Sequence, residues 1–194
     1  MGKSPAFRTM IDEEPEQGSR GSLVIVATLV YSGFVVTALL WLYLRDRVLI
    51  LPEMAFGELE AYASLGVGTA VGLGLSGIIA LLVRYQAAFQ GLEARLRATL
   101  GSLSESEIVL IAMTSAIGEE LLFRCALQDV VGPYLSALVF GALHTGPGLL
   151  LWGACAAILG LCFSLLIDSG CGLLSVTVAH ALINFISLRR MTLP

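Results

Sequence analysis

The chain has 194 residues, of which 57% are hydrophobic and only 13% are charged, and its mean hydropathy is +0.87. This composition excludes a soluble globular domain and predicts an integral membrane protein surrounded by lipid. The net charge of −4 comes with no basic patch, which excludes nucleic acid as a partner.

The first part of the chain predicts a polar tail followed by two membrane spans. Residues 1–21 are polar and acidic, as expected of a solvated N-terminal tail. Uncharged runs at 22–44 and 61–83 each exceed the roughly 20 residues needed to cross a bilayer core. The second run carries a small residue at every fourth position, which lets another helix approach closely. These residues are Ser64, Gly68, Gly72 and Ser76.

The segment 84–104 has the pattern of an amphipathic helix. Its apolar residues repeat at three- and four-residue spacing, and they are Tyr85, Phe89, Leu92, Leu96 and Leu100. Arg95 and Arg97 are interspersed with them. This pattern is typical either of a helix lying in the membrane interface or of a connector packed on the protein itself. The two spans and this connector make up a predicted region at 22–101.

A further region, 102–190, is expected to contain four more spans. Ser104 and the glutamates that follow it are N-terminal helix signals for a span at 107–129. Gly132-Pro133 is predicted to break this helix, and further spans are expected at 134–144, 149–167 and 172–188. Six spans place both termini on one side, and the distribution of arginine and lysine puts that side in the cytoplasm. The expected fold is thus an all-α, multi-pass transmembrane helix bundle of about six spans.

Several ionisable residues lie within the apolar sequence of the predicted spans. They are Glu119, Glu120, Arg124, and the two histidines of the chain, His144 and His180. Ionisable groups are expensive in lipid, so they usually point into the bundle and serve a function. Phe140 is one helical turn from His144, and Asn184 is one turn from His180, so each pair shares a helix face.

Helical geometry indicates which of these residues can act together. Adjacent residues on a helix point about 100° apart, so Glu119 and Glu120 are not expected to face one cavity. Glu120 and Arg124 are four residues apart and are predicted to form a buried ion pair, apart from the site. Glu119 is then free to converge with His144, His180 and Asn184.

This set of side chains suits hydrolysis. A glutamate can accept a proton from water, and a histidine can share that water. The second histidine and the asparagine can donate hydrogen bonds to an oxyanion. Alternatively, Glu119, His144 and His180 could be three ligands of Zn²⁺ with an open fourth position. A purely structural role and a proton-coupled transporter are further alternatives, although no internal repeat supports a transporter.

The motifs Glu119-Glu120-x-x-x-Arg124, Phe140-x-x-x-His144 and His180-x-x-x-Asn184 resemble, in order and in placement, those of a known membrane family. This is the CPBP (Abi) family of CAAX-protease and bacteriocin-processing intramembrane endopeptidases, which is related to the type II CAAX prenyl endopeptidase. The resemblance covers about residues 102–190.

The resemblance implies a four-helix proteolytic core with its site open to the cytoplasmic side of a bacterial plasma membrane. Carried over to this chain, Glu119 and His144 activate the water, and His180 and Asn184 stabilise the oxyanion. Glu120, Arg124 and Phe140 support the architecture. The implied enzyme is metallo- or glutamate-dependent, and its substrate is a membrane-associated or prenylated peptide or protein. Members of this family are also linked to immunity and to scaffolding, so a non-catalytic protein that retains the fold is the alternative.

Overall fold

A computed structural model describes residues 14–192, with the side chains described from residue 23 onward. Within this part of the chain the secondary structure is helical, with an isolated β-bridge between Gly57 and Cys171. This confirms the expected all-α class. In chain order the elements are α2 (Glu14–Leu44), the 3₁₀ helix η1 (Val48–Ile50), α3 (Leu51–Phe56), α4 (Ala61–Tyr85), α5 (Ala87–Leu100), α6 (Glu105–Glu120), the π-helix η2 (Leu121–Leu127), α7 (Gln128–Leu143), α8 (Leu150–Asp168) and α9 (Leu173–Thr192).

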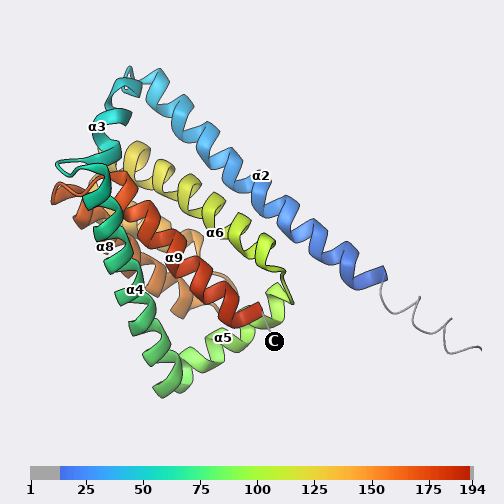
Figure 1. The fold of residues 1–194 in the computed structure, drawn as a ribbon. Helices are drawn as coiled ribbons and strands as arrows, with labels where there is room; N and C mark the ends of the chain where they lie inside the picture. Colours follow the sequence, from blue (N-terminus) through green and yellow to red (C-terminus); the bar gives the residue numbers. More distant parts are fainter. Residues whose placement is uncertain (1–13, 193–194) are drawn as a thin grey trace, which may run out of the picture.

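The six predicted spans fall on helical segments, and the one predicted at 107–129 extends over α6, η2 and the first residues of α7. Three helices of the described part are by themselves long and apolar enough to cross a membrane, namely Leu23–Leu44, Ala61–Tyr85 and Leu150–Asp168. Helix α2 begins at Glu14, inside the predicted tail, and the rest of that tail, residues 1–13, lies outside the described residues. Helix α2 runs along the outside of the bundle, and α9 lies between α4 and α6 (Figure 1).

Helices α4 and α9 are in close contact because α4 presents its small residues to α9. All four members of the predicted stripe in α4 are buried. A Cβ atom added to Gly68 would lie 2.5 Å from the carbonyl oxygen of Ser175, and one added to Gly72 would lie 3.0 Å from the Cα of Ala179. The stripe therefore acts as predicted, by letting two helix backbones approach.

Helix α5 is a connector that packs against the rest of the protein. Its apolar positions Phe89, Leu92, Leu96 and Leu100 are half-buried, and the helix contacts α4 and α9. Glu93 on α5 forms an ion pair of 2.8 Å with Arg190 at the end of α9. Of the two interpretations of this segment, these contacts favour the connector.

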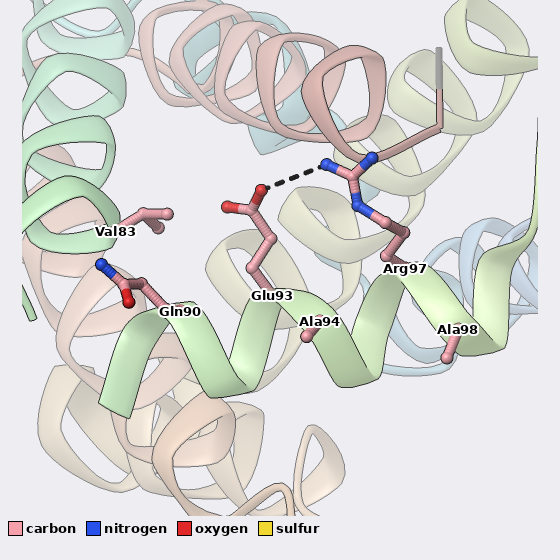
Figure 2. A pocket seen from close by; sticks show the side chains of 6 residues that line it. All are labelled: Val83, Gln90, Glu93, Ala94, Arg97 and Ala98. Carbon is pink, nitrogen blue, oxygen red and sulfur yellow. Dashed lines mark hydrogen bonds and ion pairs between the residues drawn. The ribbon is translucent and has the colours of Figure 1, made fainter. Parts of the chain in front are cut away.

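A groove of about 370 Å³ lies along α5 and the end of α4 (Figure 2). It is lined by Val83, Gln90, Glu93, Ala94, Arg97 and Ala98. None of the residues expected at the catalytic site lines it. The groove is therefore a feature of the connector.

Helix α6 begins and α7 bends where the sequence signals predicted. Ser104 caps α6 in a reciprocal capping box with Glu107. Gly132 has φ 78° and ψ 173° and interrupts α7 immediately before Pro133. This φ lies in the left-handed region that glycine adopts without strain, so the kink occurs at a residue that tolerates it.

Arginines lie at both ends of the bundle, with more of them at one end than at the other. Arg45 and Arg47 both pair with Asp129, at 2.9 and 2.8 Å, where α2 ends and α7 begins. At the other end of the bundle, Arg189 near the end of α9 pairs with Glu105 at the start of α6. The residues Arg95, Arg97 and Arg190 are joined to this same end through α5.

Candidate active site

The candidate site lies where α6 changes into the π-helix η2, with α7 and α9 alongside. Glu119 and Glu120 are the last two residues of α6, and Arg124 lies within η2. A π-helix inserts an extra residue into a helical turn and often occurs at functional sites. Within η2 the carbonyl oxygen of Phe123 accepts the backbone N–H of Gln128 and also a 2.9 Å hydrogen bond from the hydroxyl of Ser136 on α7. Helix α7 is thereby tied to the wide turn that follows the two glutamates.

Glu119 lies between the two histidines. Its Oε1 is 3.9 Å from Nε2 of His144, and its Oε2 is 3.5 Å from Nε2 of His180. The carboxylate is buried, with 4% of the residue exposed. Three residues from three different helices, up to 61 positions apart in the chain, therefore meet at one carboxyl group.

The remaining ring nitrogens of both histidines have other partners. Nδ1 of His144 lies 2.8 Å from the carbonyl oxygen of Phe140, one turn earlier on α7. A carbonyl oxygen can only accept, so this Nδ1 carries the hydrogen. Nδ1 of His180 lies 2.7 Å from Oε1 of Glu120 and donates to that carboxylate. Both imidazoles are thus held so that their Nε2 atoms face Glu119.

Glu120 and Arg124 form the ion pair that their spacing predicted. Nε of Arg124 lies 3.1 Å from Oε2 of Glu120, and neither side chain is exposed. The prediction that this pair stays apart from the site was wrong, because the other oxygen of Glu120 holds His180. Glu119 and Glu120 do point in different directions from the helix. However, an imidazole has nitrogens on two edges, so two diverging glutamates reach the same ring from both sides.

Phe140 and a glycine on α8 enclose the ion pair. The guanidinium of Arg124 lies over the Phe140 ring, 5.2 Å from its centroid, and this cation–π contact lowers the cost of burying the charge. The same ring lies 4.4 Å from the His144 ring. Gly160 leaves space for both, since a Cβ atom there would be 3.0 Å from Phe140 and 3.4 Å from Arg124. Phe140 thus supports both the charged pair and the histidine one turn later.

Asn184 lies one turn from His180 and is held by a residue that the sequence analysis did not identify. Its Nδ2 donates a 2.9 Å hydrogen bond to Oγ of Ser115 on α6. Ser115 is buried, with 2% exposed, and lies four residues before Glu119. That spacing is the signal that could have found it, because it places Ser115 on the same face of α6 as Glu119.

Two aromatic residues at the site were also missed. The carbonyl oxygen of Tyr31 on α2 would be 2.7 Å from a Cβ atom at Gly118, the residue before Glu119. The Trp152 ring of α8 meets the His144 ring edge-on at a centroid distance of 5.4 Å. Neither residue belongs to a motif, so only the assembled bundle shows that they border the site.

The site is most open at His144. Its side chain is 20% exposed, against 9% for His180 and 6% for Glu119. The loop that follows His144 is tied to the arginine-rich end of the bundle, because Arg95 donates a 2.7 Å hydrogen bond to the carbonyl oxygen of Gly148. The loop that follows the most exposed residue of the site therefore lies beside α5.

A resident zinc ion would need three or four ligating side chains close together. Among residues 14–192, no three His, Cys, Asp or Glu side chains form a group with the geometry to hold a metal. The expected zinc ligands Glu119, His144 and His180 are close together, yet they do not form such a group. In the described part of the chain, the arrangement thus does not fit a three-ligand zinc site.

Comparison with known proteins finds one family that part of this chain resembles. Residues 102–186 match the family model described as Rce1-like, type II CAAX prenyl endopeptidase Rce1-like. No curated protein and no solved structure matches the chain. The matched segment contains α6, η2, α7, α8 and most of α9, and with them all the motif residues of the candidate site. Residues 102–186, and with them the candidate site, are therefore similar to the type II CAAX prenyl endopeptidase Rce1-like family.

Proposed function

We propose that the protein is an intramembrane endopeptidase that hydrolyses a peptide bond in a membrane-associated or prenylated peptide. The observation that carries this proposal is the position of Glu119, whose two carboxylate oxygens face the Nε2 atoms of two oriented histidines. The family match supports CAAX-type proteolysis in general. The substrate, the side of the membrane and the role of each residue are part of the proposal.

Water activation is assigned to Glu119 and His144. A water placed beside both groups gives a proton to the Glu119 carboxylate as its oxygen attacks the scissile carbonyl carbon. His144 accepts the second hydrogen of this water in a hydrogen bond through Nε2, because its Nδ1 hydrogen is used by Phe140. The carbonyl π bond breaks as the new C–O bond forms, which leaves a negative charge on the former carbonyl oxygen.

Stabilisation of this oxyanion is assigned to His180 and Asn184. Glu120 occupies Nδ1 of His180, so donation to the oxyanion requires a hydrogen on Nε2, that is, an imidazolium. The surrounding charges favour this form, because Glu119 and Glu120 carry two negative charges against one positive charge on Arg124. When the C–N bond breaks, the proton held by Glu119 passes to the leaving amine, and Glu119 is an unprotonated carboxylate again.

The proposal is tested with the purified, reconstituted protein and a farnesylated peptide that ends in Cys-aliphatic-aliphatic-X. We expect cleavage, detected by mass spectrometry, and weaker cleavage of the unprenylated peptide. Glu119→Gln keeps the shape of the side chain but removes the proton acceptor. The rate should therefore fall by about 10²–10⁴-fold, the range typical of lost acid–base catalysis.

The matched control is Glu105→Gln. Glu105 lies on the same helix in an exposed ion pair with Arg189, so this variant should cleave at the wild-type rate. Full activity of Glu119→Gln would rule out the proposed mechanism and favour a scaffold or immunity role. Loss of activity on chelation, with recovery on addition of zinc, would overturn the metal-free form of the mechanism.

A further inference from the structure

We infer that Ser115 is a positioning residue, which sets the orientation of the Asn184 amide for the oxyanion of the reaction proposed above. This inference rests on the proposed function, because Asn184 matters to the chemistry only if an oxyanion forms there. Ser115 does not touch the reacting atoms and acts through Asn184.

The hydrogen bonds of Ser115 have a direction. Its hydroxyl donates to the carbonyl oxygen of Ala112 at 3.2 Å, one turn earlier on α6. The hydroxyl hydrogen is thereby used, so toward Asn184 the serine oxygen can only accept. The side chain placed 2.9 Å from it must therefore present a donor, which is Nδ2 of the amide and not Oδ1. The chain from Asn184 through Ser115 to Ala112 selects one of the two flipped states of the amide.

In the selected state, the amide of Asn184 can donate a hydrogen bond to the oxyanion. The Nδ2 group carries two hydrogens, and Ser115 accepts one of them, so the second hydrogen is free for an oxyanion. In the flipped state Oδ1 would take the place of Nδ2 and would repel a negative charge. Donors that are oriented before the reaction stabilise a developing charge without a cost of reorganisation.

The position of Ser115 in the bundle holds the amide at the level of the site. Helices α6 and α9 are in contact, and their cross-contacts run in antiparallel order. Arg189 pairs with Glu105 at one end, Asn184 bonds Ser115 further along, and His180 meets Glu119 and Glu120 one turn later. Ser115 therefore orients Asn184 in the same way as Glu120 orients His180. In each case a residue of α6 holds a side chain of α9.

The experiment is a double-mutant cycle on the reconstituted protein, with the farnesylated peptide as the probe. Ser115→Ala removes the acceptor and leaves Asn184 in place, so we expect kcat to fall about tenfold with KM unchanged, the pattern of an interaction made only in the transition state. Asn184→Ala should lower kcat by about 10²–10³-fold. In the Asn184→Ala background, Ser115→Ala should change kcat by less than about twofold, because nothing is left for Ser115 to orient.

Two further variants separate positioning from general packing. Ser115→Thr keeps a hydroxyl and should retain kcat within about threefold of wild type, since a helical threonine can also bond the preceding turn. Ser175→Ala removes the hydroxyl of a buried serine of α9 that has no hydrogen-bond partner within the described chain, so it should leave kcat unchanged. A tenfold loss from Ser115→Ala that persists in the Asn184→Ala background would overturn the inference.

The outcomes also distinguish this inference from the proposed function. If Glu119→Gln is inactive while Ser115→Ala is fully active, the positioning role fails and the proposed hydrolysis stands. If Glu119→Gln is fully active, the proposed function itself fails.

Discussion

Glu120 has a more direct part in the site than its place in the motif indicated. One of its oxygens holds the buried guanidinium of Arg124, and the other accepts the Nδ1 hydrogen of His180. A buried carboxylate with two such partners is compensated for its loss of water. The same arrangement couples the charge of Arg124 to the orientation of His180, so a change at Arg124 should reach the site through Glu120.

Arg124→Ala should destabilise the protein strongly. The variant leaves Glu120 buried without its cationic partner, and breaking such a buried pair costs about 3–5 kcal/mol. It also removes the contact with Phe140. Thermal unfolding in detergent should therefore occur at a clearly lower temperature than in the wild type.

Arg189→Ala is the matched control for this prediction. Arg189 also pairs with a glutamate, but its side chain is 57% exposed and that of Glu105 is 52% exposed. An exposed ion pair contributes about 0–1 kcal/mol, so the unfolding temperature should barely change. Equal stability of the two variants would show that the Glu120–Arg124 pair is not a buried ion pair.

At the scale of elements, two local features position the site residues: the π-helix η2 and the small-residue face of α4. The π-helix η2 follows Glu120, and the carbonyl oxygen of Phe123 within it accepts hydrogen bonds from the backbone of Gln128 and from the hydroxyl of Ser136 on α7. The small-residue face of α4 lets α9 lie close, and α9 carries His180 and Asn184. The position of α9 therefore depends on a helix that lies outside the matched segment 102–186.

Gly68→Leu should displace α9 and lower both stability and activity. Even a Cβ atom at Gly68 would lie 2.5 Å from the backbone oxygen of Ser175, which cannot move without shifting α9. Overpacking of this kind costs about 1–3 kcal/mol. The variant is compared with the wild type by thermal unfolding in detergent and by the peptide assay.

Gly74→Leu is the control on the same helix. A Cβ atom at Gly74 meets nothing within 4 Å, so the added side chain faces away from the bundle. We expect unfolding temperature and cleavage rate close to wild type. If both glycine variants behave alike, the contact between α4 and α9 does not depend on the small-residue face.

At the scale of the whole molecule, the charges at the two ends give the bundle a direction. Arg95, Arg97, Arg189 and Arg190 lie at one end, and Arg45 and Arg47 at the other. From the positive-inside rule we predict that the arginine-rich end, with the loop after His144, lies in the cytoplasm. The exposed edge of the site would accordingly be reached from that side.

Cysteine labelling tests this orientation. In a background without the native cysteines, Ser102→Cys lies in the exposed loop between α5 and α6, and Glu53→Cys lies in α3 at the opposite end. A maleimide that does not cross membranes should label Glu53→Cys in intact cells that express the protein. It should label Ser102→Cys only after the cells are opened. The reverse pattern would invert the orientation and place the site opening outside.

The sequence by itself determined the helices and the group of residues at the site. Hydrophobic runs, the Ser104 cap and the Gly132-Pro133 break are local signals, so the helix positions were predicted well from them. The polar residues Glu119, His144, His180 and Asn184 could be grouped because a charged or polar group in an apolar span must face the interior. The pairing of Glu120 with Arg124 followed from their spacing on one helix.

Only the tertiary structure decided how residues on different helices meet. The hydrogen bond from His180 to Glu120, the support of Asn184 by Ser115, and the places of Tyr31 and Trp152 all depend on the relative rotation and depth of packed helices. Helical periodicity defines which face a side chain occupies, but it carries no information about which partner helix covers that face. For this reason the sequence did not predict that Glu119 and Glu120 would both contact one imidazole. In the structure, the ring of His180 lies between them.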